Sequence, residues 1–216
     1  MKIMSNLEGK FIVIEGPDGA GSSTQVRKLG SYFARRNIPA LETKEPTNGL
    51  VGGIIRATLN KIWVCSPYGL QLLFCADRAL HLYHEVEPAL KAGKWVISDR
   101  YAPSTIVYGA TENPEIDEDI WNRLKLINDP FRKPDLSLFL DIEIRLGIGR
   151  MDSDGTRAMR DLYETEERLA RVMSGYRRLA REYLHAVLVD ANGPIEDVHE
   201  RIVGIVNERL LGGQNE

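Results

Sequence analysis

Residues 11–24, FIVIEGPDGAGSST, constrain the fold more than any other segment of this 216-residue chain. Four apolar residues, Phe11 to Ile14, are followed by a turn that begins at Gly16, which is typical of a buried parallel strand. The stretch from Thr24 to Arg36 is compatible with a helix. A strand, a glycine-rich turn and a helix start in this order predict a loop that binds phosphate at the positive end of the helix.

The loop fits the pattern Gly-x-x-x-x-Gly-Lys-[Ser/Thr] at Gly16, Gly21 and Ser23. In this pattern the glycines let backbone N–H groups converge on phosphate, and the hydroxyl residue reaches Mg²⁺. Ser22 stands where the pattern has lysine. The alternative is a tight turn that needs glycine for steric reasons alone. The rest of the chain decides between the two interpretations.

Composition restricts the kinds of partner. Lys and Arg total 28 against 31 Asp and Glu, and the net charge of −3 gives no overall attraction for nucleic acid or an anionic membrane. Cys65 and Cys75 lie in apolar surroundings without metal-ligand spacing, which predicts buried free thiols. The first ten residues lack a signal-peptide core, and no long apolar run is present. We expect a cytoplasmic protein that binds neither nucleic acid nor membrane.

Further strands are predicted near residues 38–43, 95–98, 136–140 and 187–189, separated by stretches of helical periodicity. This alternation predicts an α/β fold of the P-loop NTPase type, with a parallel sheet of about five strands flanked by helices on both faces. We expect one domain over residues 1–216. The polar segment 151–161 contains Gly155, and Arg150, Arg157 and Arg160 suit a lid around residues 150–161 that closes on phosphates.

The expected strand ends carry polar residues. Glu45 precedes Pro46 after the second strand, and Asp99 and Arg100 follow the third. In parallel sheets ligands bind at the carboxyl ends of the strands. A carboxylate there can hold Mg²⁺ or its water, and a guanidinium can bind phosphate in a bidentate manner, although an isolated Asp-Arg pair is more often a surface ion pair.

Two expected helices add aromatic and polar side chains. Phe74 and Arg78 are four residues apart and share a helix face, where a ring can stack on a base and a guanidinium can bond to its edge. The alternative is a core phenylalanine beside a solvated arginine. Ser104 and Tyr108 also share a face and either line a sugar pocket or pack in the core.

Together these motifs resemble the thymidylate kinases of the P-loop nucleoside monophosphate kinase group. The resemblance covers nearly the whole chain and rests on GPDGAGSST, KEPT, LLFCADRALHL, SDRYAPST with Tyr108, and DLYE at residues 161–164. Their order and spacing together are specific, although several motifs are weak alone.

The resemblance implies a role for each matching residue. The ATP site would comprise Gly16, Asp18, Gly19, Ala20, Gly21, Ser22, Ser23 and Thr24, with Arg150 against adenine. The dTMP site would comprise Asp18 at the 3′-hydroxyl, Glu45 near the reacting phosphates, Phe74 on thymine, Arg78 at the base edge and acceptor phosphate, Arg100, Ser104, and Tyr108 at the sugar. Ser23 and Asp99 would position Mg²⁺. The catalytic group would comprise Asp18, Glu45, Arg100, Arg157 and Arg160.

Three positions depart from the family pattern. Lys44 replaces the arginine before Glu45, Gly109 replaces the glutamine that often follows the residue matched by Tyr108, and Ser22 replaces the loop lysine. Family members with glycine at the Gly19 position tend to use a lid arginine, which here would be Arg157 or Arg160.

The resemblance implies Mg²⁺-dependent transfer of the ATP γ-phosphoryl group to dTMP, and it implies a homodimer. Two other hypotheses stay open: a kinase for another nucleoside monophosphate or a deoxynucleoside, and a catalytically weak or silent nucleotide-binding protein, which Ser22 alone favours.

Overall fold

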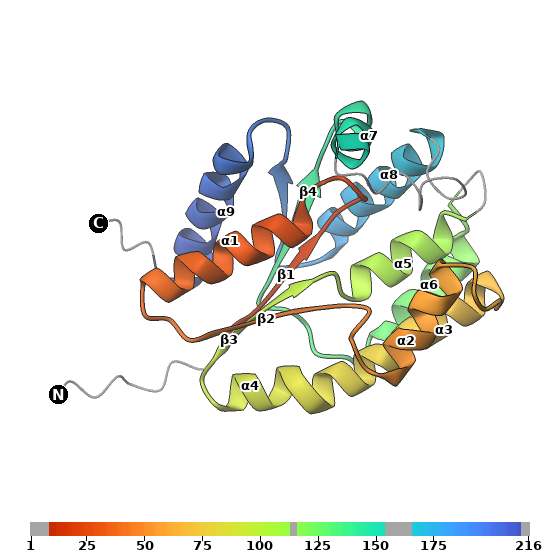
Figure 1. The fold of residues 1–216 in the computed structure, drawn as a ribbon, viewed down its shortest axis with the longest axis horizontal. Coiled ribbons are helices and arrows are strands. Elements are labelled where there is room, and N and C mark those ends of the chain that lie inside the picture. Colours follow the sequence, from red (N-terminus) through yellow and green to blue (C-terminus); the bar gives the residue numbers. More distant parts are fainter. Residues whose placement is uncertain (1–8, 113–115, 154–165, 213–216) are drawn as a thin grey trace.

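The computed structural model describes residues 9–112, 116–153 and 166–212. Its centre is one sheet of five strands, β1 (Phe11–Glu15), β2 (Ala40–Lys44), β3 (Trp95–Asp99), β4 (Leu136–Asp141) and β5 (Ala186–Asp190). The spatial order is β2-β3-β1-β4-β5, and all neighbouring pairs are parallel. The central strand β1 therefore places the phosphate-binding loop between the ends of β3 and β4 (Figure 1).

Helices cover both faces of the sheet (Figure 1). Helices α1 (Ser22–Arg35) and α9 (Ile195–Leu210) lie on one face. The other face carries α3 (Pro67–His81), its π-helical continuation η1 (Leu82–Val86), α4 (Glu87–Lys91), α5 (Ala102–Ala110), α6 (Glu118–Asn128) and α8 (Glu166–Glu182). Helix α2 (Leu50–Leu59) contacts α3, and α7 (Ile144–Ser153) contacts α8.

The alternation of side chains along β1 explains the two layers. Ile12 and Ile14 belong to the core beneath α1 and α9, whereas Phe11 and Val13 pack with η1, α4 and the start of α5. Because successive side chains of a strand point to opposite faces, a strand buried on both faces must be continuously apolar. The predicted α/β fold with a five-stranded parallel sheet is confirmed.

Element boundaries differ slightly from the predicted ones. Strand β2 begins at Ala40, so Ile38 lies in the connection after α1, where it packs against the core formed with α1 and α9. Helix α1 begins at Ser22 because Gly21 ends the loop in a left-handed conformation. Apolar character reports burial and does not distinguish a strand residue from a buried loop residue.

Both cysteines are free thiols, as predicted. Cys75 is buried, and desolvation raises the pKa of its thiol. Cys65, however, is only partly buried, because it lies in the connection between α2 and α3. Among the described residues, no helix combines the length and apolar character needed to cross a membrane.

Candidate active site

The phosphate-binding loop connects β1 to α1. Gly19 and Gly21 have positive φ values of 80° and 92°, which other residues adopt only with strain. A Cβ atom at Gly19 would also lie 2.3 Å from the carbonyl oxygen of Gly147, so the loop packs directly on the backbone of α7. No side chain caps the start of α1. Its first N–H groups therefore remain available to a phosphate oxygen.

Ser22 and Ser23 form the first turn of α1. Ser22 is half-buried, and its hydroxyl makes no hydrogen bond within the described part of the chain. Ser23 donates a short hydrogen bond from Oγ to Oδ2 of Asp99 at the end of β3. The structure thus joins the two residues that the sequence assigned to Mg²⁺.

The other oxygen of Asp99, Oδ1, is buried and has no hydrogen-bond partner among the described residues. An orphaned carboxylate oxygen beside a serine hydroxyl fits a cation or its bound water. Within the described ranges, no cluster of three or more His, Cys, Asp or Glu side chains is arranged to hold a metal. Ser23 and Asp99 therefore fit an ion that takes its remaining ligands from phosphate and water.

Asp18, Arg100 and Tyr108 form a second cluster across the loop. Arg100 Nη2 donates to Oδ1 of Asp18, and Tyr108 donates from its hydroxyl to Asp18 Oδ2 at 3.2 Å. The guanidinium carbon of Arg100 lies 5.2 Å from the centre of the Tyr108 ring. The side chains of Asp18 and Arg100 are partly exposed, at 39% and 22%. A cation held beside an open phosphate-binding loop is well placed to bind anionic oxygens.

The backbone of Arg100 is held in an unusual conformation. Its φ is 70°, a value that non-glycine residues rarely adopt and that often marks functional sites. Two hydrogen bonds hold it there: Arg100 N–H donates to Ile14 O at 3.0 Å, and Ser98 Oγ donates to Arg100 O at 2.8 Å. The side chain of Arg100 therefore leaves the sheet in a direction set by β1 and β3.

Ser104 connects this cluster to Glu15, which sequence reasoning missed. Arg100 Nη1 donates to Ser104 Oγ at 3.3 Å, and Ser104 donates to Glu15 Oε2 at 2.6 Å. The hydroxyl of Tyr176, from α8, lies 2.8 Å from Ser104 Oγ. Glu15 is fully buried, and desolvation raises its pKa to about 8. The carboxylate of Glu15 at the end of an apolar strand was the sequence signal that could have identified it, whereas no nearby residue indicated a role for Tyr176.

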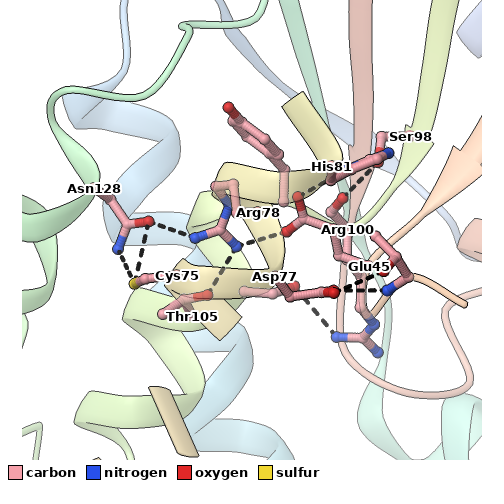
Figure 2. Close-up of polar contacts among 12 residues, drawn as sticks. Glu45, Cys75, Asp77, Arg78, His81, Ser98, Arg100, Thr105 and Asn128 are labelled. Atoms are coloured by element: carbon pink, nitrogen blue, oxygen red, sulfur yellow. Dashed lines mark hydrogen bonds and ion pairs between the residues drawn. The ribbon is translucent and has the colours of Figure 1, made fainter. Parts of the chain in front are cut away.

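Glu45 and Arg78 form a buried ion pair between the end of β2 and α3 (Figure 2). Arg78 Nη2 donates to Glu45 Oε2 at 2.7 Å and to Thr105 Oγ1 at 2.9 Å, and its Nη1 donates to Asn128 Oδ1. The guanidinium also lies 4.9 Å from the centre of the Tyr101 ring. Arg78 is 0% exposed, so the alternative of a solvated arginine is wrong. Asn128 is 50 residues away and gave no signal in the sequence.

Asp77, the neighbour of Arg78, anchors the segment after β2. Its carboxylate accepts from Thr47 N at 2.7 Å and from Thr47 Oγ1 at 2.6 Å. Arg56 of α2 donates to the carbonyl oxygen of Thr47. Consecutive residues of α3 thus hold Glu45 and Thr47. Arg56 is a cation near the site that sequence reasoning also missed.

The remaining candidates fall at three places. Phe74 is half-buried on α3, one turn from Arg78. Arg150 of α7 donates from Nη2 to the carbonyl oxygens of Ala191, at 3.2 Å, and Gly193, at 2.7 Å. The predicted lid arginines Arg157 and Arg160 lie outside the described residues.

Comparison with known proteins agrees with this geometry. The family model described as thymidylate kinase matches residues 14–202. A probable thymidylate kinase from Thermococcus gammatolerans is 34% identical over 213 residues, which cover 95% of this chain and 99% of the relative. The thymidylate kinase of Legionella pneumophila is 34% identical over 208 residues, or 95% of this chain and 97% of the relative. That of Geobacillus thermodenitrificans is 32% identical over 212 residues, or 96% and 94%. With its phosphate-binding loop, the Asp18–Arg100–Tyr108 cluster and a match over nearly its whole length, the chain belongs to the thymidylate kinase family.

Proposed function

We propose that the protein transfers the γ-phosphoryl group of ATP to dTMP and releases dTDP and ADP. The observation that carries this proposal is the pairing of Arg100 with Asp18 across the phosphate-binding loop. It places a guanidinium between the loop, where the donor phosphates bind, and Tyr108, which lines the acceptor side. Phosphoryl transfer depends mainly on positioning and charge neutralisation, which such a cation supplies.

The donor binds along the loop from Gly16 to Thr24. The uncapped N–H groups at the start of α1 bind phosphate oxygens, and the helix dipole adds to the attraction. Arg150 lies against the adenine at the Ala191–Gly193 segment, to which it is already bonded. Ser23 and Asp99 hold Mg²⁺, which supplies positive charge to the phosphates when it is bound.

The acceptor binds between α3 and α5. Phe74 stacks on the base, and Arg78, which is bonded to Thr105, contacts the base edge and the acceptor phosphate. Tyr108 occupies the side of the sugar where a 2′-hydroxyl would project. Asp18 accepts from the 3′-hydroxyl, and its bond with Tyr108 fixes the carboxylate for this contact. Glu45 is only 4% exposed, so it supports the reacting phosphates mainly by holding Arg78.

The loop contributes no cationic side chain, because Ser22 stands at the lysine position. We expect Arg157 or Arg160, from the lid around residues 150–161, to supply the missing charge. Removal of one preorganised donor typically lowers the rate about 10²- to 10³-fold, so the enzyme is expected to be slow unless the lid supplies this charge.

The decisive experiment measures ADP release from ATP with a panel of nucleoside monophosphates and deoxynucleosides, with Mg²⁺ and after its chelation. Preferential use of dTMP that depends on Mg²⁺ supports the proposal. Preference for another acceptor assigns a different kinase activity. ATP binding without turnover on any acceptor assigns a silent nucleotide-binding protein, the hypothesis that Ser22 favours.

We also propose that the protein is a cytoplasmic homodimer. Large apolar side chains are exposed on α2, on α3 and between them, and burial of such side chains favours association. They are Leu50, Ile54, Leu59, Ile62, Trp63, Val64, Leu72 and Leu80. Light scattering tests this: the wild-type protein is expected at twice the chain mass and Val64→Lys at the chain mass. A monomeric wild-type protein contradicts the proposal.

A further inference from the structure

Gly109 follows Tyr108 on α5, and the space beside its backbone is filled from two other helices. A Cβ atom at Gly109 would lie 2.4 Å from Leu124 Cδ1, 2.8 Å from Gln71 Cγ and 3.3 Å from Gln71 Cδ. Distances under 3 Å are not tolerated without movement. The side chain of Gln71 therefore packs against α5 and occupies the space that a side chain at position 109 would need.

The carboxamide oxygen of Gln71 is buried, and none of the described residues donates a hydrogen bond to it. The residue is 3% exposed, and its Oε1 has no hydrogen-bond partner among the described residues. Buried polar atoms in folded proteins are nearly always paired, so an unpaired acceptor requires a specific explanation. A ligand that brings its own donor is one such explanation, and the position of Gln71 on α3 favours it.

Gln71, Phe74 and Arg78 are spaced i, i+3 and i+7 and so lie along one stripe of α3. At one end of the stripe Arg78 donates to Thr105 of α5. At the other end Gln71 packs against Gly109 of α5. The stripe therefore follows α5 from Thr105 to Gly109, with Phe74 between the two polar ends.

We propose that Gln71 is a substrate-binding residue whose carboxamide bonds to the pyrimidine edge of the acceptor. This inference rests on the proposed phosphorylation of dTMP. A carboxamide offers one acceptor oxygen and two donor hydrogens. Thymine presents an N3–H donor beside carbonyl acceptors, so Oε1 of Gln71 accepts from N3–H and Nε2 donates to a carbonyl oxygen. Oε1 of Gln71, which no described residue bonds to, thereby gains a donor.

The same carboxamide also fits cytosine. Cytosine has an unprotonated N3 and an exocyclic amino group in place of N3–H and O4. A carboxamide that is turned over donates from Nε2 to N3 and accepts at Oε1 from the amino group. Uracil has the same edge as thymine, so Gln71 is expected to strengthen the binding of each pyrimidine nucleotide and to leave the preference among dTMP, dUMP and dCMP nearly unchanged.

The test compares Gln71→Met with wild type. Methionine keeps the length and flexibility of the side chain and removes both hydrogen-bonding groups. The KM for dTMP is expected to rise about tenfold or more, because the base loses two hydrogen bonds, while the KM for ATP stays within twofold. The KM values for dUMP and dCMP are expected to rise by a similar factor, so that the ratios among the three acceptors stay nearly unchanged.

Gln25 provides a matched control. It is also 3% exposed and also has an unpaired Oε1, but it lies on α1, where its Nε2 bonds to Ile195 O of α9. Gln25→Met is expected to leave the KM for dTMP unchanged. If Gln71→Met does not fold, Gln71→Glu, which keeps an acceptor oxygen and loses the donor, is measured in its place and is expected to weaken dTMP binding by calorimetry.

The outcomes separate the two proposals. A wild-type protein that does not phosphorylate dTMP overturns the proposed function, and the inference with it. A wild-type protein active on dTMP, combined with an unchanged KM for dTMP in Gln71→Met, overturns the inference alone and assigns Gln71 to helix packing. Unchanged dTMP affinity in Gln71→Glu has the same meaning.

Discussion

Ser104 donates a hydrogen bond of 2.6 Å to Glu15, which joins the first turn of α5 to the end of β1 beside the phosphate-binding loop. Ser104 also accepts from Arg100. The direction of the Arg100 side chain therefore depends on a carboxyl group that the solvent does not reach.

Glu15 is expected to make stability depend on pH. Burial raises its pKa from 4.5 to about 8, against the opposing effects of Ser104 and Arg100. Between these values the folded protein keeps a proton that the unfolded chain releases. The free energy of unfolding therefore falls as pH rises through this window, by up to about 1.4 kcal/mol per pH unit.

Glu15→Gln removes this contribution, and chemical denaturation between about pH 5 and pH 8 should give a flatter profile than wild type. Glu196→Gln is the control. The pKa of Glu196 is lowered by its bond from Lys28, so its contribution is already complete above the usual carboxyl pKa and stays constant in this window. Parallel profiles for wild type and Glu15→Gln would show that Glu15 is ionised in the folded protein.

Replacement of Arg78 is expected to destabilise the fold strongly. Arg78→Met leaves the buried carboxylate of Glu45 without its main partner, which typically costs about 3 to 5 kcal/mol. Arg132→Met, which breaks a partly exposed pair with Glu87, should cost about 1 kcal/mol or less. Denaturant unfolding measures both. Equal losses for the two variants would mean that the buried pair has no special role in stability.

Arg100→Lys is expected to lower turnover about 10²- to 10³-fold with little loss of stability. A lysine ammonium cannot contact Asp18 and Ser104 in the planar arrangement that the guanidinium of Arg100 uses. Arg177→Lys is the control, because Arg177 pairs with Asp141 on the exposed side of α8. Steady-state kinetics compares them, and near-normal turnover of Arg100→Lys would remove Arg100 from the group that stabilises the transition state.

Ser22→Ala is expected to retain turnover within a few-fold of wild type, since the Ser22 hydroxyl makes no hydrogen bond within the described residues. A hydroxyl is also too short to follow a moving phosphoryl group as lysine does. The measurement is kcat together with ATP affinity. A collapse of kcat at unchanged ATP affinity would show that the serine donates an essential hydrogen bond.

Arg157→Ala or Arg160→Ala is expected to reduce kcat much more than ATP binding, because a lid arginine contacts the phosphates mainly in the closed, reacting state. The control is Arg123→Ala, which removes an exposed arginine paired with Asp119 on α6. Steady-state kinetics gives kcat and ATP titration gives the ATP affinity of the three variants. Wild-type kcat in both lid variants would show that neither arginine replaces the charge of the missing loop lysine.

Local patterns in the sequence were sufficient to predict the sheet and the loop between β1 and α1. The apolar run at Phe11–Ile14 and the glycines that follow predicted β1, the loop and α1. A strand buried on both faces needs consecutive apolar residues, and a positive φ favours glycine, so both features are visible in a short stretch of sequence. Asp99 and Arg100 were identified in the same way, since parallel strands end at one edge. The meeting of Ser23 with Asp99 follows from β1 and β3 being neighbours.

Only the tertiary structure determined which polar side chains are buried and what they contact. Arg78 bonds to Asn128, 50 residues away, and Glu15 contacts Ser104 and Tyr176, which lie 89 and 161 residues away. Spacing along a helix showed that Gln71, Phe74 and Arg78 share a face, but not that Gln71 packs against Gly109 on another helix. Such contacts depend on helix packing around the sheet, and desolvation by that packing, not residue type, sets the pKa of Glu15.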